Sequence, residues 1–449
     1  MKLSSFLIIL IFSIILSLKS EPEACVSKNS IWDWIINRNN KITTTSPLVI
    51  KTTATPVANN KTTPASTKII EDDEMQAILD ISTSINQFSF ELHEVIANNT
   101  NGSFISSPLS AAMILMMAAY GARSENAKEI NSVLHIDTNN ITYKIGINSL
   151  IRMLNVIDPS EVQLIHKIYA AENVEIDPHF MNFVKTTFES SVKNVDFKTY
   201  TNTSIKTNNW WADQTYHRIT NVIESENMLV LVNVLVFTGI WGSTFEEKNT
   251  RLEHFHLNDT NSKKVPMMNQ LFQTPYGVLS EIDATFVILE YEKDFNDDDV
   301  MKMIIILPNK INGLDSIEKK IHKLQLADFN GKLHQVNVSL PKFRINSTIN
   351  LEDMLTKLGM KIAFQEAADF SGILKINSGL KINKVNQHVM IHVDEECTGT
   401  AAIIKSTYSH RMKRSSPSLE KVSFYADHPF LILIANNNTV IFTGRVVDV

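Results

Sequence analysis

Residues 231–250 read LVNVLVFTGIWGSTFEEKNT, and their first half decides how the fold is layered. From Met228 to Trp241 the chain is apolar almost without interruption. Such a run is typical of a strand that is covered on both faces, because a strand with one wet face alternates apolar and polar residues. The segment KMIIILP at 302–308 has the same character. The sequence therefore predicts a sheet that is buried between other layers.

Helices and further strands surround these two segments. Apolar residues at helical spacing predict a helix within 75–97, and Ser107, Pro108 and Gly121 mark the start and the end of a second helix. The predicted class is α+β, with a C-terminal half that is rich in strands. Further patterns predict helices at 314–324 and 351–360, an alternating strand at 336–345, and two strands joined by an Asn-rich turn at 430–447.

The composition is that of an ordinary globular protein. Of the 449 residues, 44% are hydrophobic and 20% are charged, and the formal net charge is −6. This weakly acidic balance argues against a protein that binds nucleic acid or a membrane surface through overall positive charge. The chain is long enough to bury a large core. We expect one domain at 74–449, and we expect it to be monomeric.

The first 73 residues differ from the rest of the chain. Residues 1–20 place an apolar run behind Lys2, which is the pattern of a secretory signal peptide and, alternatively, of a signal anchor. Residues 21–73 form a flexible arm, in which a linker rich in Thr and Pro at 41–68 cannot bury a core. The apolar segment IWDWII at 31–36 is a docking peptide or a contact with the main domain. We expect a secreted, extracellular protein without a membrane span.

Acceptor triplets for N-glycosylation agree with secretion. Because an Asn-rich chain produces Asn-x-Ser/Thr triplets by chance, we expect only some of them to carry a glycan. The candidates are Asn60, Asn98, Asn101, Asn140, Asn202, Asn258, Asn337, Asn346 and Asn437.

The sequence carries no signature of an enzyme. It has no Gly-rich phosphate loop, no paired-Cys metal site and no G-x-S-x-G turn. His254 and His256 could face one side of a strand, but no cluster of carboxylates or cysteines accompanies them, so we predict no metal site. The acidic run at 296–299 lacks the further ligands of a calcium loop. We expect neither catalysis nor a cofactor.

One segment near the C-terminus fits no core element. Residues 395–416 read EECTGTAAIIKSTYSHRMKRSS, so they begin with acids, continue as small and β-branched residues, and end in basic residues. The first half has little bulk and favours strand geometry, so it could enter a sheet without displacing core side chains. The second half offers Arg and Lys to a protease with an acidic specificity pocket.

Several motifs make the chain resemble the serpin family from about residue 75 to the C-terminus. Residues 104–122 contain the family's Ser-Pro-x-Ser signature, and residues 231–250 contain its Asn-x-x-x-Phe-x-Gly-x-Trp stretch. Further motifs follow in the order of the family, namely VPMM at 265–268, LPKF at 340–343, ADFSGI at 368–373 and the closing ADHPFLILIANNNTVIFTGRVV at 426–447.

The resemblance implies a fold of about nine helices around three β-sheets, with an exposed reactive loop at about 395–420. It also implies a function. A target protease attacks the loop and forms an acyl-enzyme through its own serine, and the cut loop then inserts into the main sheet. The carried protease is distorted, so the inhibition is a kinetic trap.

The hinge of the loop matches the family with departures. Glu395 and Glu396 match the residues before the hinge, and Thr398 matches the small residue that enters the sheet first. Other positions depart, since Cys397 and Gly399 replace the usual Gly and Glu, and Ile404 replaces the usual Thr, which weakens the match. The complete hinge is Glu395, Glu396, Cys397, Thr398, Gly399, Thr400, Ala401 and Ala402.

The resemblance also implies a polar cluster beneath the sheet that governs its opening. Ser107, Ser110 and Asn233 match its members, and Gln387 stands where most serpins have His. Gln can still donate and accept hydrogen bonds. Trp241 matches an indole near the point where the loop enters. A structural role describes these residues as well as a functional one.

Two positions compete for the scissile bond. Counting about seventeen residues from Glu395, the usual distance in the family, places the bond between Arg411 and Met412. Counting back from the closing His-Pro-Phe favours Arg414 and Ser415. We favour Arg411, because slack before the bond would weaken the distortion of the protease. Arg suits a trypsin-like serine protease in both cases, and Arg-Met-Lys-Arg also fits a furin-like convertase, as a target or as a processing enzyme.

The altered hinge would also fit a non-inhibitory serpin that binds or carries a ligand. Cys25 and Cys397 are the two cysteines of the chain. A disulfide between them would tether the hinge, while a buried free thiol or a pairing between molecules are the other states. The segment 143–152 shows only scattered basic residues, so we expect no heparin-type cofactor.

Overall fold

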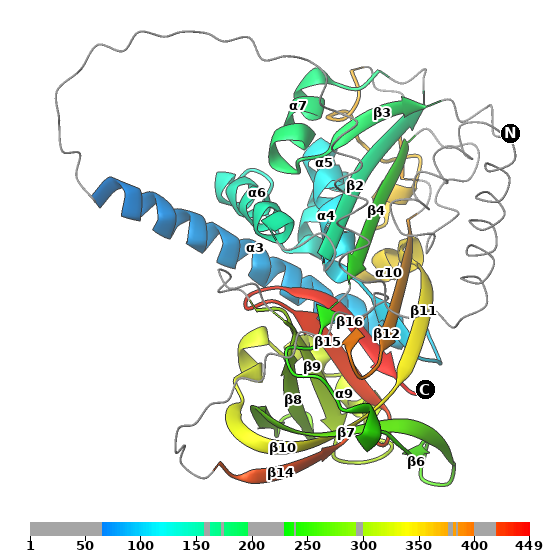
Figure 1. Ribbon diagram of the computed structural model, residues 1–449. Coiled ribbons are helices and arrows are strands. Elements are labelled where there is room, and N and C mark those ends of the chain that lie inside the picture. The colour runs from blue at the N-terminus through cyan, green and yellow to red at the C-terminus, as the bar shows by residue number, and fades with distance from the viewer. Residues whose placement is uncertain are drawn as a thin grey trace, which may run out of the picture. The chain divides into compact units, whose positions relative to one another are not determined.

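Three β-sheets organise the residues that the computed structural model describes (Figure 1). All of these residues belong to one compact unit, Thr63–Thr398 with Ser416–Val449. The predicted α+β class is confirmed, since helices and sheets share a core. The described residues are 65–156, 162–171, 175–195, 229–237, 239–292, 300–375, 380–382, 385–398 and 419–449.

The largest sheet has nine strands and contains one of the two segments that were predicted as buried strands, together with the predicted strand pair at 430–447. KMIIILP forms β9, Lys302–Pro308, in which every side chain after the lysine is buried. The Asn-rich turn joins β15, Phe430–Ala435, to β16, Val440–Val446, and β15 also pairs with β9. The other strands are β1 Phe104–Ser106, β6 Arg251–His256, β7 Ser262–Leu279, β8 Ala284–Glu290, β10 Lys332–Pro341 and β14 Lys421–Tyr425.

The two smaller sheets divide the strand that was predicted at 228–241. One sheet contains β2 Val162–Ala171, β3 Ser191–Val195 and β4 Leu229–Phe237, and the other contains β5 Gly239–Ile240, β11 Phe343–Asn350, β12 Asn386–Val393 and β13 Cys397–Thr398. The prediction of one strand is therefore wrong, because β4 and β5 belong to different sheets. At this boundary a Cβ on Gly239 would lie 2.4 Å from the Tyr291 ring, so only glycine permits such a close approach.

The helices predicted at 75–97 and 107–121 are present. The first is longer than predicted, because it begins at Ala65, within the segment assigned to the flexible arm. None of the described helices combines the length and the hydropathy that crossing a bilayer requires. The helices are α3 Ala65–Ala97, α4 Pro108–Gly121, α5 Ser124–Leu134, α6 Ile141–Val156, α7 Pro178–Thr187, α9 Leu314–Glu318 and α10 Leu351–Leu358, with short 3₁₀ turns η1 Glu247–Asn249, η2 Ile321–Lys323, η3 Leu326–Phe329 and η4 Ile362–Phe364.

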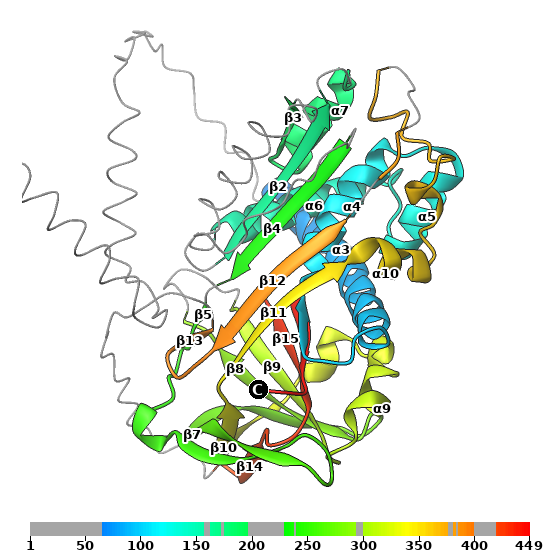
Figure 2. The same cartoon turned by 90° about the vertical axis from the view of Figure 1, so that its right-hand side faces the viewer.

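α4 occupies the centre of the core because its sequence is apolar nearly all round. The Ser107 Oγ accepts a hydrogen bond from the Ser110 backbone N–H at 3.2 Å, which caps the first turn. Pro108 follows where its missing N–H costs nothing. Every α4 residue except Tyr120 is buried. The helix contacts α3, α5, β16 and β4, so it packs against one face of the sheet that contains β4 (Figure 2).

The helix predicted at 314–324 is broken into two pieces. α9 ends at Glu318, and the backbone leaves the helical region at Lys320, where φ is −120° and ψ is −2°. The turn η2 follows. Ile317 and Ile321 are nevertheless buried, so the apolar spacing predicted which side chains face the core but not the length of the helix.

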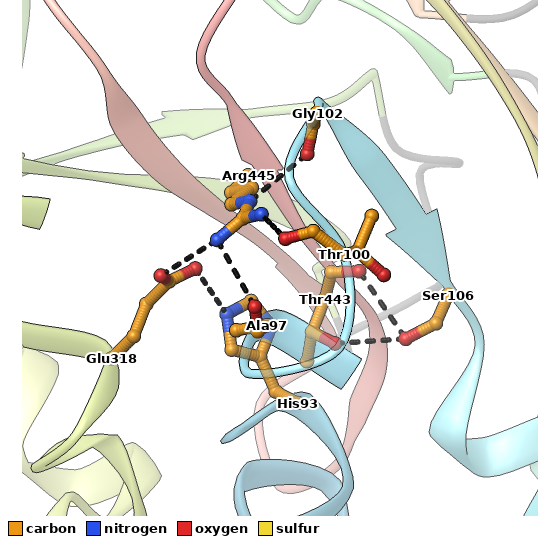
Figure 3. A network of polar contacts seen from close by, with 8 residues as sticks. All are labelled: His93, Ala97, Thr100, Gly102, Ser106, Glu318, Thr443 and Arg445. Atoms are coloured by element: carbon orange, nitrogen blue, oxygen red, sulfur yellow. Dashed lines mark hydrogen bonds and ion pairs between the residues drawn. The ribbon is translucent and has the colours of Figure 1, made fainter. Parts of the chain in front are cut away.

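Arg445 of β16 joins three elements at the C-terminal end of α3 (Figure 3). Its guanidinium donates to the backbone carbonyls of Ala97 at 3.5 Å, of Gly102 at 3.0 Å, and of Thr100. Ala97 is the last residue of α3, where a helix leaves carbonyls without partners of its own, and the other two carbonyls lie in the connection to β1. Glu318 of α9 accepts from the same guanidinium at 2.9 Å, and both charged side chains are buried. This network fastens α3, α9 and β16 to one another.

Candidate functional site

The hinge of the predicted loop lies where β13 enters a sheet (Figure 2). Thr398 pairs with Val393 of β12 on one side and with Gly239 of β5 on the other, and both pairings are antiparallel. The two glutamates that precede β13 form the turn out of β12. The first residues of the predicted loop are therefore already a strand between two other strands.

Trp241 holds this turn in place. Its indole Nε1–H donates to the Asp394 carbonyl at 2.9 Å, and its backbone N–H donates to the Glu396 carbonyl at 3.1 Å. Trp241 is only 3% exposed, and its indole ring stacks on the Tyr291 ring with centroids 4.8 Å apart. Since both its polar edge and its face are fixed, the indole anchors the backbone from which the loop departs.

Glu395 is a buried carboxylate with a partner for each oxygen. Its Oε1 accepts from the Thr250 hydroxyl at 2.7 Å, and its Oε2 pairs with the Lys342 ammonium at 2.6 Å. Its backbone carbonyl accepts from the Phe245 N–H at 3.0 Å. Burial raises the pKa of Glu395, but the hydrogen bonds from Lys342 and Thr250 lower it by more, so this pKa lies below its ordinary value. The ionised form therefore stabilises the hinge.

β4 and β12 lie side by side with an edge of each facing the other (Figures 1 and 2). β4 pairs with β2, and β12 pairs with β11 and, at Val393, with β13. Within the described ranges no strand joins β4 to β12. Two neighbouring strand edges of this kind form the geometry that can accept one more strand.

Gln387 and Ser107 pair in both directions beneath β12. Gln387 is 5% exposed, and its Oε1 accepts from the Ser107 N–H at 3.0 Å while its Nε2 donates to the Ser107 carbonyl at 2.7 Å. The Ser107 hydroxyl donates to the Ile441 carbonyl at 3.0 Å. His388 points to the other face, where it contacts the Thr348 hydroxyl at 3.1 Å. Gln387, rather than its neighbour, thus ties the start of α4 to β12.

The predicted sheet-opening residues divide into two places. Ser107, Ser110 and Gln387 lie together. Asn233 lies in β4, where its backbone pairs with His166 of β2, and its side chain is outside the described part. Trp241 contacts the hinge instead, so it belongs with Glu395 and not with the polar residues under the sheet.

Several predicted residues lie outside the described ranges. They include the scissile candidates, the second half of the hinge and the cysteine of the arm, namely Arg411, Met412, Arg414, Ser415, Gly399, Thr400, Ala401, Ala402 and Cys25.

The glycosylation candidates differ in exposure. Asn258 and Asn337 are half-buried, and Asn60 and Asn202 lie outside the described ranges. The exposed candidates are Asn98, Asn101, Asn140, Asn346 and Asn437.

Some residues at the hinge had no predicted role. Lys342 and Thr250 were visible only as members of longer motifs, and nothing in the chain links Lys342 to a glutamate 53 residues later. Tyr291 follows β8, and no sequence pattern around it predicted that it stacks on Trp241. The pairing of Glu395 with Lys342 and Thr250 carries no signal in a single sequence, because it depends on which strands become neighbours.

The two histidines in EHFHL lie on a strand, as predicted. His254 of β6 shares a hydrogen bond with the Ser262 hydroxyl at 3.0 Å. In the part of the chain that the structure describes, no group of three or more His, Cys, Asp or Glu side chains is placed to hold a metal ion.

Comparison with known proteins points to one family. The family model described as Serpin (serine protease inhibitor) matches residues 83–449. Serpin B4 of Homo sapiens is 29% identical over 394 residues, which cover 81% of this chain and 98% of that protein. Leukocyte elastase inhibitor of Xenopus tropicalis is 30% identical over 383 residues, with coverages of 81% and 98%.

Solved structures agree with this match. Serpin48 of the insect Tenebrio molitor superposes with a TM-score of 0.69 at 27% identity, covering 84% of this chain and 99% of that one. Human thyroxine-binding globulin superposes with a TM-score of 0.71 at 25% identity, with coverages of 83% and 99%. The chain is thus similar to protease inhibitors and to a thyroxine-binding globulin that share one fold.

Proposed function

Because this chain belongs to the serpin family, we propose that it inhibits a trypsin-like serine protease, which cuts the loop at 395–420 before the loop inserts between β4 and β12. The observation that supports this proposal is β13, which is antiparallel to β12 and to β5. A strand that continued β13 would meet the edges of β12 and β4, and its backbone hydrogen bonds would release free energy. The protease supplies the nucleophile, so the inhibitor itself catalyses nothing.

The register of β13 assigns a position to the unusual Ile404. Since Thr398 faces Val393, an unbroken antiparallel register would put Ile404 opposite Gln387. On the β4 side the same register would put Ile404 opposite Asn233. Residues that oppose each other share a face of the sheet, so Ile404 would turn inward. Both the oxygen and the nitrogen of the Gln387 amide already bond to the Ser107 backbone. An apolar Ile404 can therefore pack against this amide without leaving a polar atom unpaired.

The basic end of the loop supports the choice of protease. Arg411 before Met412 is the preferred scissile bond, and Arg414 before Ser415 is the second choice. An arginine fits a pocket with an acidic base through a bidentate pair. A furin-like convertase is the alternative enzyme for Arg-Met-Lys-Arg, as a trapped target or as a processing enzyme.

The proposal includes secretion into the extracellular space. The apolar run at 1–20 and the acceptor triplets support it, and so does the polar arm at 21–73 ahead of the domain. We place the protein as a monomeric glycoprotein that regulates an extracellular proteolytic cascade, without nucleic-acid or membrane partners.

A binding or carrier protein is the second candidate function. The likeness to thyroxine-binding globulin, solved in complex with thyroxine, favours it, together with the departures at Cys397 and Gly399 in the hinge. If these hinge residues slow the insertion of the loop, the protease is released before it is trapped. The protein would then be a protease substrate, and binding rather than inhibition would be its function.

Incubation with trypsin and, separately, with furin tests the proposal. The purified protein is mixed with each enzyme, and the products are separated on a denaturing gel and identified by mass. We expect a complex that survives detergent and a released C-terminal peptide that begins at Met412. A peptide that begins at Ser415 would move the bond to Arg414.

Two further outcomes would change the proposed function. Trapping of furin alone would replace the trypsin-like target by a convertase. Clean cleavage by both enzymes without any complex would contradict inhibition and leave the binding protein.

A further inference from the structure

Exposed apolar side chains lie on the outer face of the strands β7, β10 and β14. Leu271 on β7 is 51% exposed, Leu333 on β10 is 54% exposed, and Tyr425 on β14 is 47% exposed. The alternate residues Val336 and Val338 of β10 are fully buried, so the opposite face packs on the core. Apolar groups collected on one exposed face of a monomer indicate a surface that something covers.

Asn337 lies at the centre of this face. In β10 it is paired with Leu271 of β7 on one side and with Ser423 of β14 on the other. Residues that oppose each other in a sheet share a face, so the Asn337 amide lies beside the Leu271 side chain. Tyr425 follows two residues after Ser423 on the same face of β14, where it is paired with Ser339. Asn337 also heads the triplet Asn-Val-Ser.

We propose that Asn337 carries an N-linked oligosaccharide whose first N-acetylglucosamine residues lie over Leu271 and Tyr425. In the transfer, the Asn337 amide nitrogen bonds to the anomeric carbon of the sugar, the bond from that carbon to a lipid diphosphate breaks, and the amide loses one proton. Sugar rings present C–H groups that pack on aliphatic and aromatic side chains, while their hydroxyl groups stay in water. The inference rests on the secretion included in the proposed function.

The burial of the hydroxyl of Ser339, the third residue of the triplet, determines whether the oligosaccharide is transferred before or after folding. The transferring enzyme must reach the Ser339 hydroxyl together with the Asn337 amide. In the folded protein Ser339 is 1% exposed, and its Oγ donates to the Asn269 Oδ1 at 2.5 Å. β10 is also paired on both sides, so it cannot leave the sheet to enter an enzyme. The oligosaccharide is therefore attached before β10 pairs with its neighbours.

Asn258 is an acceptor whose triplet hydroxyl stays accessible after folding. Its triplet lies in the turn between β6 and β7, and the Thr260 hydroxyl donates to the Asn258 Oδ1 at 2.9 Å. Thr260 is exposed, so both side chains of the triplet stay at the surface after folding. Asn258 can accept an oligosaccharide on the folded protein, and it serves as the matched control for the order of events.

Site occupancy in protein secreted from eukaryotic cells is the first test. Enzymatic removal of N-glycans in ¹⁸O-labelled water converts each occupied Asn into a labelled Asp, which peptide mass spectrometry assigns to its position. We expect label at Asn337. Label at other acceptors without label at Asn337 would overturn this inference alone. Absence of label from every acceptor would overturn it together with the proposed glycoprotein, while recovery of the protein from the medium and the protease trapping test the proposed function independently.

The order of events is tested with folded protein made in bacteria, which lacks glycans. Purified oligosaccharyltransferase and a lipid-linked oligosaccharide are added to the folded protein and, separately, to a peptide of residues 332–341. We expect the peptide to be modified at Asn337 and the folded protein to be modified at Asn258 but not at Asn337. Modification of Asn337 in the folded protein would contradict the proposed order.

The covering role is tested with Asn337→Gln and with Asn346→Gln as its control. Asn346 is also a mid-strand acceptor, but it lies on β11 opposite Met390. In secreted protein we expect Asn337→Gln to bind about twice as much of a dye for exposed apolar surface. We also expect its Tm to fall by about 1–2 °C, as for a loss near 1 kcal/mol in a domain of this size. Equal dye binding and equal Tm for the two variants would show that the glycan leaves Leu271 and Tyr425 exposed.

Discussion

At the scale of single residues, the hinge depends on one buried carboxylate. Glu395 holds its position through Lys342 and Thr250, and its backbone carbonyl fixes Phe245. Because the folded pKa of Glu395 lies below the unfolded value, its ionised form stabilises the fold above the unfolded pKa. That contribution is lost as the pH falls through the folded pKa.

This sign leads to a pH prediction. Below the ordinary glutamate value of 4.5, we expect the amides of Phe245 and Trp241 to lose protection against hydrogen exchange, after correction for intrinsic rates. Glu395→Gln should remove this dependence on pH. Glu91→Gln is the control, because the pKa of Glu91 is also lowered but its partner is His135, away from the hinge. An unchanged pH profile in Glu395→Gln would refute the role of the carboxylate.

Gln387 is the second residue with a measurable role. Replacing Gln387 by Leu leaves the buried N–H and carbonyl of Ser107 without side-chain partners. Because the Ser107 carbonyl keeps the Ala111 N–H as a partner, we expect a loss of about 1–3 kcal/mol in the free energy of unfolding, measured by urea denaturation. His388→Leu, on the opposite face of the same strand, should cost less than about 1 kcal/mol. Equal losses in the two variants would mean that the Gln387 pair does not matter.

At the scale of elements, stability depends on how the end of α3 is fastened. The Arg445 guanidinium donates to the carbonyl of Ala97, the last residue of α3, and to the Gly102 carbonyl in the connection to β1, and Glu318 balances its charge (Figure 3). Apolar spacing predicted both α3 and the burial around α9. It contained nothing about the fastening, because Glu318 and Arg445 are 127 residues apart in the chain.

Removal of the Glu318 carboxylate tests this fastening. Glu318→Ala leaves the buried Arg445 without its counter-charge, and we expect a loss of about 3–5 kcal/mol in the free energy of unfolding. The double variant Glu318→Ala with Arg445→Met should recover part of that loss, because it also removes the unpaired charge. Glu125→Ala, which breaks only the exposed pair with Lys128, should change stability little. Calorimetry of the variants would contradict the role of the network if Glu318→Ala matched Glu125→Ala.

At the scale of the whole molecule, inhibition requires that two sheets become one. β4 closes the sheet β3-β2-β4, and β12 lies in the sheet β11-β12-β13-β5, with β13 already between β12 and β5. An inserted strand would add backbone hydrogen bonds along both edges, each contributing about 0.5–1.5 kcal/mol. The loop therefore needs a side chain on every inward position that tolerates burial.

Ile404 and Lys405 test this requirement. Continued from Thr398 and Val393, the register turns Ile404 toward Gln387 and Lys405 to the outer face. We expect Ile404→Glu to convert the protein from an inhibitor into a substrate of trypsin, because a buried carboxylate without a partner opposes insertion. Lys405→Glu should still form complexes. Stoichiometry of inhibition measures both, and a fully inhibitory Ile404→Glu would rule out this register.

Much of the fold could be read from local patterns. The helix from Ser107 to Gly121, the apolar β9 and the Asn-rich hairpin of β15 and β16 depend on spacing and turn residues that a single sequence carries. The resemblance to the family, rather than a local pattern, pointed to Gln387, which stands where most serpins have His. The break after Glu318 and the separation of β5 from β4 were not predicted, because each depends on what packs against the chain at that point.

The order of motifs along the chain was enough to assign the family. Local patterns predicted many of its helices and strands, since apolar periodicity, capping residues and turn residues act within a few neighbouring positions. Tertiary structure alone decided that Lys342 meets Glu395, that Trp241 clamps the hinge, and that Asn337 lies among exposed apolar side chains. These contacts join residues that are distant in the chain, and their energy appears only when strands and helices become neighbours in space.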